Sequence, residues 1–289
     1  MAKRVGGQAV IEGVLMIGKR AVIAVRNPEK EIVTEEVGKI KNTLWKKIPF
    51  VRGIYNLYYS LLFGIKALNR SAEIAYNEEM KKGEGVITIL IAFAVAIGLF
   101  FMLPMFLTNL LKPLRGNEFA FSLVEGLIRI GFFLLYVWII SLMKDVRRIF
   151  QYHGAEHKTI NAFESGIELV PKNVKGYSRI HPRCGTNYLM IFMISSVILF
   201  SFLSLFFKPT LEYRIVSRVI MIPVIASLSY ELLVLFSKFP KWLMKIVISP
   251  GLALQYLTTK EPDEEQLEVA IVALKEALKG EGEDIDIMA

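Results

Sequence analysis

The side chains best suited to bind a metal ion lie in one short segment of this chain. Its only histidines, His153, His157 and His181, and its only cysteine, Cys184, all fall between residues 153 and 184. His153 and His157 are four residues apart, so on a helix they would share one face, about 6 Å apart in rise. Two neutral imidazoles on one helix face supply half of many zinc sites. We therefore expect this segment to bind zinc or another divalent transition metal.

An acid within the same pattern suggests what such a metal could do. Glu156 directly precedes His157 and borders the face that the two histidines share. His-x-x-Glu-His is the inverted form of the His-Glu-x-x-His motif of zinc peptidases. In such motifs the carboxylate is not a ligand and can act as a general base. The pattern therefore predicts Glu156 as the catalytic residue of a metal-dependent enzyme.

The remaining ligands decide the kind of site, because two histidines do not hold a catalytic zinc ion. His181 and Cys184 have the spacing His-x-x-Cys, which suits a turn that offers both side chains to one ion. If both bind, the site is closed and structural; if one binds, a position stays open for water. Glu164 would follow His157 on the same helix face, about 10 Å further along. It is expected to support the site from outside or to lie at the surface.

Most of the elements that must position these residues are predicted to span a membrane. Crossing a bilayer takes about 20 apolar residues. The chain has 289 residues, 54% of them hydrophobic, and four long apolar segments, at 86–111, 119–143, 188–207 and 215–237. We therefore predict an α-helical membrane protein with about four transmembrane helices, a small N-terminal β-meander and amphipathic interfacial helices.

The distribution of Lys and Arg predicts the orientation. The chain carries 15 of these residues before the first apolar segment, 8 in the loop 144–187 and 6 after residue 237, but only 2 in each of the other two connections. Positively charged loops stay on the cytoplasmic side. We therefore expect a multi-pass plasma-membrane protein with both termini and the His/Cys loop in the cytoplasm. The alternative, four buried helices of a soluble protein, does not predict this alternation.

The net charge of +8 is consistent with either nucleic acid or an anionic membrane as a partner. The basic residues follow the flanks of the apolar segments and do not cluster with aromatic residues on one element. No nucleic-acid partner is therefore expected. The expected partners are the lipid bilayer and, as a further option, other membrane proteins. The single cysteine excludes an intramolecular disulfide.

The parts outside the apolar segments differ from one another in amino-acid composition and in the structure they predict. Segments rich in Val and Ile at 8–17, 21–26 and 31–37 predict the antiparallel meander. Apolar residues recur on one helix face over 54–68, which is too short to span, so this helix either lies at the lipid headgroups or packs on the meander. A second interfacial or re-entrant segment is expected at 240–257, broken at 249–251, and a soluble helix at 262–279.

These expectations divide the chain into five parts. They are the meander with its amphipathic helix (1–85), a transmembrane hairpin (86–143), the cytoplasmic His/Cys loop (144–187), a second transmembrane hairpin (188–237), and an interfacial segment with a C-terminal helix (238–289).

A few charged residues lie inside the apolar segments, where an ionisable group is a functional candidate. Glu125 and Arg129 have the spacing and order of a helical ion pair, and Arg218 could compete for Glu125. Mutual neutralisation that permits insertion is the preferred interpretation of that pair. Glu231 has no evident partner and is expected to be a third carboxylate near the histidines.

Three groups of motifs resemble one known family. They are VGGQAVIEGVLM near the start, YHGAEHKTI with SRIHPRCGTN in the middle, and PGLALQYLTTKEP with EVAIVAL near the end. Together they resemble the bacterial YqhQ-like proteins, whose shared domain has no known function. The resemblance implies a metal-dependent enzyme of the membrane, and it places His153, Glu156, His157, His181 and Cys184 in the family's characteristic motifs.

Two functions of different kinds follow from these patterns. The first is a zinc-dependent hydrolase, in particular a peptidase, that acts at the cytoplasmic face of the membrane with Glu156 as its base. The second is a non-catalytic membrane scaffold or membrane-protein assembly factor, in which the same residues form a structural metal site. A transporter is less well supported, because the chain has no internal repeat.

Overall fold

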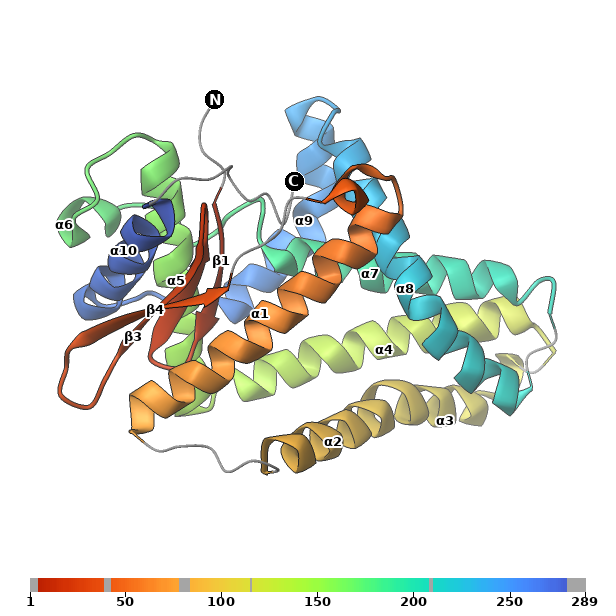
Figure 1. Cartoon of the computed structure of the whole chain (residues 1–289). Helices are drawn as coiled ribbons and strands as arrows, with labels where there is room; N and C mark the ends of the chain where they lie inside the picture. Colours follow the sequence, from red (N-terminus) through yellow and green to blue (C-terminus); the bar gives the residue numbers. More distant parts are fainter. Residues whose placement is uncertain (1–4, 39–42, 78–83, 115, 208–209, 280–289) are drawn as a thin grey trace.

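A computed structural model describes residues 5–38, 43–77, 84–114, 116–207 and 210–279 (Figure 1). Long helices run together on one side of the molecule. A small β-sheet, covered by helices on both faces, lies on the other side. The protein is therefore mostly helical with a small N-terminal sheet, as predicted.

Four helical stretches of the described chain are long and apolar enough to cross a membrane. They span Leu90–Leu110, Glu118–Ile140, Gly185–Leu203 and Glu212–Phe236, within a few residues of the four predicted segments. The first is built from α2 (Glu84–Ile97), a π-helical turn (Gly98–Met102) and α3 (Leu103–Leu110). The others are α4 (Glu118–Ile140), α7 (Gly185–Leu203) and α8 (Leu211–Phe236).

The N-terminal meander has four strands, where three Val/Ile-rich segments were predicted. The strands are β1 (Gly6–Val10), β2 (Gly13–Ile17), β3 (Ala21–Arg26) and β4 (Ile32–Gly38), antiparallel in that order. The prediction of one segment over 8–17 was wrong, because a two-residue turn at Ile11 and Glu12 divides it. Glu12 has a φ of 50°, a left-handed conformation that suits a tight hairpin turn.

Helices cover both faces of the sheet, which explains why β2 and β3 are almost continuously apolar. Alternate residues such as Val14 and Met16 face α5 (Lys144–Glu164) and α10 (Glu264–Leu278). Their neighbours Leu15 and Ile17 face α1 (Val51–Tyr76). The N- and C-terminal parts of the chain and the His/Cys segment thus share one three-layer unit (Figure 1).

Helix α1 packs on the sheet through a different face from the one predicted. Phe63 and Ala67 contact the sheet. Five residues of the predicted apolar face remain exposed: Ile54, Tyr58, Leu61, Ile65 and Leu68. The helix therefore packs on the meander, one of the two predicted alternatives, but not through the predicted apolar face. An exposed apolar face of this kind is compatible with contact to lipid headgroups.

Helix α9 (Lys241–Thr258) continues through the predicted break. Pro250 lacks the N–H that would bond to the carbonyl of Ile246. The hydroxyl of Ser249 donates a hydrogen bond of 2.7 Å to that carbonyl. Gly251 lets α9 approach α7 closely, because a Cβ there would lie 2.2 Å from Oδ1 of Asn187. The prediction of a broken segment was wrong because local side chains compensate for the proline.

Candidate metal centre

Helix α5 holds the histidine pair against the N-terminus of α7. His153 Nε2 lies 3.3 Å from Cys184 Sγ. The rings of His153 and His157 have centroids 4.4 Å apart. One potential ligand atom from each of His153, His157 and Cys184 lies within 4.8 Å of the other two. The fold thus brings together three of the four residues that the sequence pattern nominates as ligands.

Two backbone carbonyls fix the orientation of the histidine pair. His153 Nδ1 lies 2.8 Å from the carbonyl oxygen of Thr258, and His157 Nδ1 lies 2.7 Å from that of Arg179. A carbonyl oxygen can only accept, so each Nδ1 must carry a proton, and in the neutral imidazole Nε2 then presents a lone pair. Histidine ligands of metals are commonly held in this way. The buried Nε2 of His157 has no hydrogen-bond partner within the described chain, so its lone pair is available to bind a metal ion.

His181 lies beside this group but is not one of its three converging residues, and its buried Nε2 also has no hydrogen-bond partner in the described chain. Its ring centroid is 5.7 Å from that of His157. Its Nδ1 accepts a hydrogen bond from the backbone N–H of Arg183, and its Nε2 lies 3.6 Å from Glu164. The side-chain amide of Gln255 bonds to both the N–H and the carbonyl of His181. Helix α9 therefore fixes the backbone of His181, and Glu164 faces that histidine.

Glu156 is buried between α5 and the edge of the sheet. Its side chain lies against Gly7 of β1, where an added Cβ would come within 2.8 Å of the carboxyl group. Burial raises the pKa of Glu156 to about 8, although the charge of His153 opposes this shift. Its Oε2 has no hydrogen-bond partner in the described chain. A divalent cation held by the neighbouring ligands would favour the carboxylate and lower this pKa.

Burial also keeps the other groups of the centre uncharged. It lowers the pKa of His157 well below the usual value and that of His181 to about 4. It raises the pKa of the Cys184 thiol. The imidazoles of His157 and His181 are therefore neutral at pH 7, as metal ligands must be. Binding of a cation by Cys184 would release the thiol proton.

Several residues that the sequence pattern did not predict also determine the geometry of this centre. Gly154 lets the chain after α9 pass close to α5, because a Cβ there would lie 2.0 Å from the carbonyl oxygen of Lys260. The backbone N–H of Lys260 donates to the carbonyl of Phe150. This contact places the Thr258 carbonyl beside His153. A backbone carbonyl leaves no signature in the sequence, whereas the glycine stands within the histidine motif.

A cavity of about 350 Å³ lies beside the cluster. His153 and Cys184 form part of its wall. The rest comes mainly from apolar parts of α1, α5, α7 and α8 and from β1. The cavity provides room for a ligand next to the three converging atoms, on a side that the protein does not fill.

Glu231 does not belong to this centre, so its prediction as a third carboxylate was wrong. Its carboxylate accepts hydrogen bonds from Arg52 Nε at 2.7 Å and Nη2 at 2.5 Å. It also accepts from the backbone N–H of Phe50 at 3.0 Å. These contacts attach the start of α1 to α8. Arg52 lies so far away in the sequence that no local pattern identifies it as the partner.

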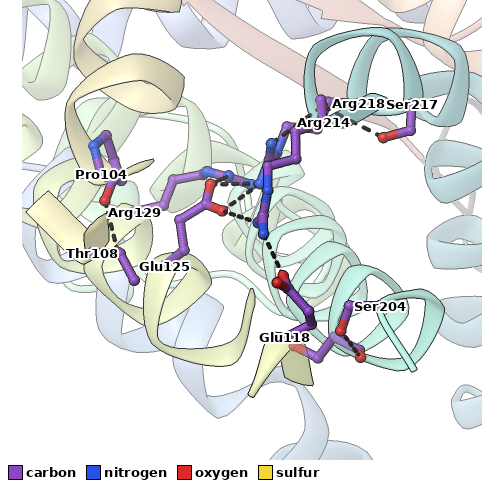
Figure 2. A network of polar contacts seen from close by, with 10 residues as sticks. Pro104, Thr108, Glu118, Glu125, Arg129, Ser204, Arg214, Ser217 and Arg218 are labelled. Atoms are coloured by element: carbon purple, nitrogen blue, oxygen red, sulfur yellow. Dashed lines mark hydrogen bonds and ion pairs between the residues drawn. The ribbon is translucent and has the colours of Figure 1, made fainter. Parts of the chain in front are cut away.

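A separate polar network surrounds Glu125 in α4 (Figure 2). Its Oε1 lies 2.5 Å from Arg129 Nη2 and 2.6 Å from Arg218 Nη2. Arg214 approaches Glu125 at 3.7 Å and pairs with Glu118 at 2.6 Å. Arg218 thus binds Glu125 together with Arg129 and does not displace it. The network lies in the first half of α4, whereas the candidate metal ligands follow the other end of that helix in the sequence.

Comparison with known proteins places the chain in a family. Residues 48–280 match the family described as Protein of unknown function (DUF1385). The chain is also 36% identical over 297 residues to the Uncharacterized protein YqhQ of Bacillus subtilis (strain 168), and the match covers 95% of this chain and 92% of that protein. No solved structure matches. The chain therefore belongs to the YqhQ-like family of unknown function, as its motifs predicted.

Proposed function

We propose that this protein is a metal-dependent membrane hydrolase that cleaves peptide bonds, with zinc as its preferred metal. The convergence of His153, His157 and Cys184 beside a cavity carries the proposal. Three protein ligands with space on the remaining side are typical of catalytic zinc sites. One thiolate and two imidazoles suit zinc better than magnesium or calcium.

Each residue of the centre has a separate task in this proposal. When bound, zinc lowers the pKa of water and polarises carbonyl groups. Glu156 takes a proton from the attacking water and passes it to the leaving amine, as a general base and then a general acid. The Thr258 and Arg179 carbonyls keep both imidazoles in the ligating tautomer. The buried surroundings exclude competing water.

The proposed location is the plasma membrane, with both termini and the metal centre in the cytoplasm. The four apolar helices are compatible with a membrane location. The excess of Lys and Arg before the first helix, in the loop 144–187 and after the last helix supports this orientation. In the cytoplasm the thiol of Cys184 would remain reduced and available to a metal.

The first test is the metal content of purified protein. We expect about one zinc ion per wild-type chain, and loss of that ion in Cys184→Ala and His157→Ala. His181→Ala is the matched control, because His181 lies beside the cluster but is not one of its three converging residues. Retention of metal in all four proteins, or in none, would contradict the proposed ligands.

The second test separates binding from catalysis. Glu156→Gln preserves the shape of the side chain but removes the base, so the variant should keep its zinc. It should fail to restore wild-type behaviour in cells that lack their own copy. Full activity of this variant would exclude the proposed role of Glu156.

The scaffold alternative also has one specific observation in its favour. The His181 ring is close enough to His157 that a side-chain rotation could add a fourth ligand and close the site. Cobalt-substituted protein distinguishes the two functions, because its visible spectrum reports the coordination of the ion. A spectrum that changes on addition of azide indicates an open position and favours the hydrolase. A spectrum unaffected by azide but altered in His181→Ala favours the scaffold.

A further inference from the structure

Strand β1 forms one edge of the sheet and also lines the cavity beside the metal centre. Gly7, Gln8 and Ala9 contribute to the cavity wall, together with His153 and Cys184. Among the residues that the structure describes, the strand order β1-β2-β3-β4 gives β1 a neighbouring strand on one side only. The cavity therefore joins the candidate centre to an edge of the sheet.

The hairpin register determines which backbone groups of β1 point toward the free edge. Val10 is opposite Gly13 across the two-residue turn, so this pair forms the first hydrogen-bonded pair of the hairpin. Antiparallel strands alternate, so Gly6 and Gln8 also bond to β2, while Gly7 and Ala9 direct their N–H and C=O groups outward.

A contact at the end of the strand supports this assignment. Ile11 is the next residue of the outward set, and its N–H donates to Oγ of Ser71 in α1 at 3.1 Å, not to β2. The same edge is thus covered by a polar group at one end. Within the described chain, the outward groups of Gly7 and Ala9 have no hydrogen bond, although both residues are partly buried.

We propose that an extended polypeptide binds in this cavity as a fifth strand beside β1. A peptide backbone can satisfy the outward N–H and C=O groups of Gly7 and Ala9, as in other cases of strand addition. Its apolar side chains can occupy the largely apolar cavity. A lipid acyl chain would fill the same space but would leave these backbone groups unsatisfied, at a cost in free energy.

The arrangement defines the class of substrate. A chain that lies along β1 passes His153 and Cys184, so one of its peptide bonds would be held beside the metal centre. The preferred ligand is an unfolded, apolar stretch of polypeptide, because a folded segment could not pair with the strand. The inference that the bound peptide is a substrate rests on the proposed function. The inference that a peptide binds beside β1 does not.

The test uses a dansyl-labelled, C-terminally amidated peptide, Ala-Val-Leu-Val-Ala-Val, and full-length protein in detergent. The protein carries Glu156→Gln to prevent turnover, and fluorescence anisotropy measures affinity. Ala9→Pro removes one outward N–H without removing a bond to β2 and should weaken binding at least tenfold. Thr34→Pro is the matched control, because the β3–β4 register directs the Thr34 N–H away from β3 at the opposite edge of the sheet.

A second measurement avoids any change in the protein. The same peptide with N-methyl groups on two adjacent central residues is blocked on whichever edge faces β1. It should bind at least tenfold more weakly than the parent peptide. Equal binding of the two peptides, no effect of Ala9→Pro, or no binding of the parent peptide would each overturn the inference. The first of these results is expected if the cavity holds lipid.

The outcome also separates the inference from the proposed function. Peptide that binds with the expected dependence on N-methylation, but is not cleaved by zinc-loaded wild-type protein, refutes the hydrolase and leaves the strand site intact. Cleavage that is insensitive to Ala9→Pro and to N-methylation would support the hydrolase and refute the strand site.

Discussion

The candidate metal centre and the Glu125 network both contain buried ionisable side chains, but the charge of the acid is balanced differently in the two. Glu125 is paired with Arg129 and Arg218 on neighbouring turns and helices (Figure 2). Glu156 has no ion pair among the described residues, and its Oε2 has no hydrogen-bond partner. The first acid is neutralised by the chain itself, whereas the second lies beside atoms that could hold a cation.

This difference indicates separate roles. Buried polar groups are normally hydrogen-bonded, so an orphaned carboxyl oxygen and an orphaned imidazole nitrogen on neighbouring residues require an explanation. A bound cation and a water molecule would satisfy both. The Glu125 network also contains unpartnered atoms, the Nε of Arg129 and of Arg218, but its guanidinium groups already bind carboxylates through Nη. It lacks a neighbouring set of metal-type ligands in the described chain.

The largest effect is expected from removal of the charge on Glu125. Glu125→Gln leaves the arginines without their shared carboxylate, and loss of one partner of a buried pair costs about 3–5 kcal/mol. Glu156→Gln breaks no ion pair and should change the free energy of unfolding by less than about 1 kcal/mol. Chemical denaturation in detergent measures both. Equal destabilisation by the two substitutions would remove the distinction between the regions.

Added zinc should act on one region only. A ligand present at 100 times its dissociation constant stabilises the folded state by about 2.7 kcal/mol. Zinc should therefore raise the melting temperature of metal-free wild-type protein and of Glu125→Gln, but not that of Cys184→Ala. A chelator should reverse the increase. An equal increase in Cys184→Ala would show that zinc binds elsewhere.

The sequence was sufficient where the determining pattern is local. The four apolar helices follow from composition over about 20 residues. The shared face of His153 and His157 follows from their spacing of four. The meander follows from short Val/Ile-rich segments, although the turn at Ile11 and Glu12 lacked a strong signal and was missed.

The features that the sequence did not predict depend on contacts between segments that are distant in the sequence. Gln255 of α9 holds the backbone of His181, and Cys184 but not His181 belongs to the group of three converging ligand atoms. The continuity of α9 depends on a hydroxyl contact next to its proline. The sequence correctly nominated the residues of the centre as neighbours but could not show which atoms converge.

The smallest effect is expected at Glu231, which the sequence had assigned to the centre. Its side chain and that of Arg52 are only partly buried, at 17% and 25% exposure, so their ion pair should contribute about 1 kcal/mol. Glu231→Gln should therefore lower stability slightly, increase hydrogen exchange at the Phe50 N–H, and leave the zinc content unchanged. Glu212→Gln, at the exposed start of the same helix, should change none of these. Loss of zinc in Glu231→Gln alone would mean that this carboxylate acts on the centre after all, because both substitutions remove one carboxylate charge from α8.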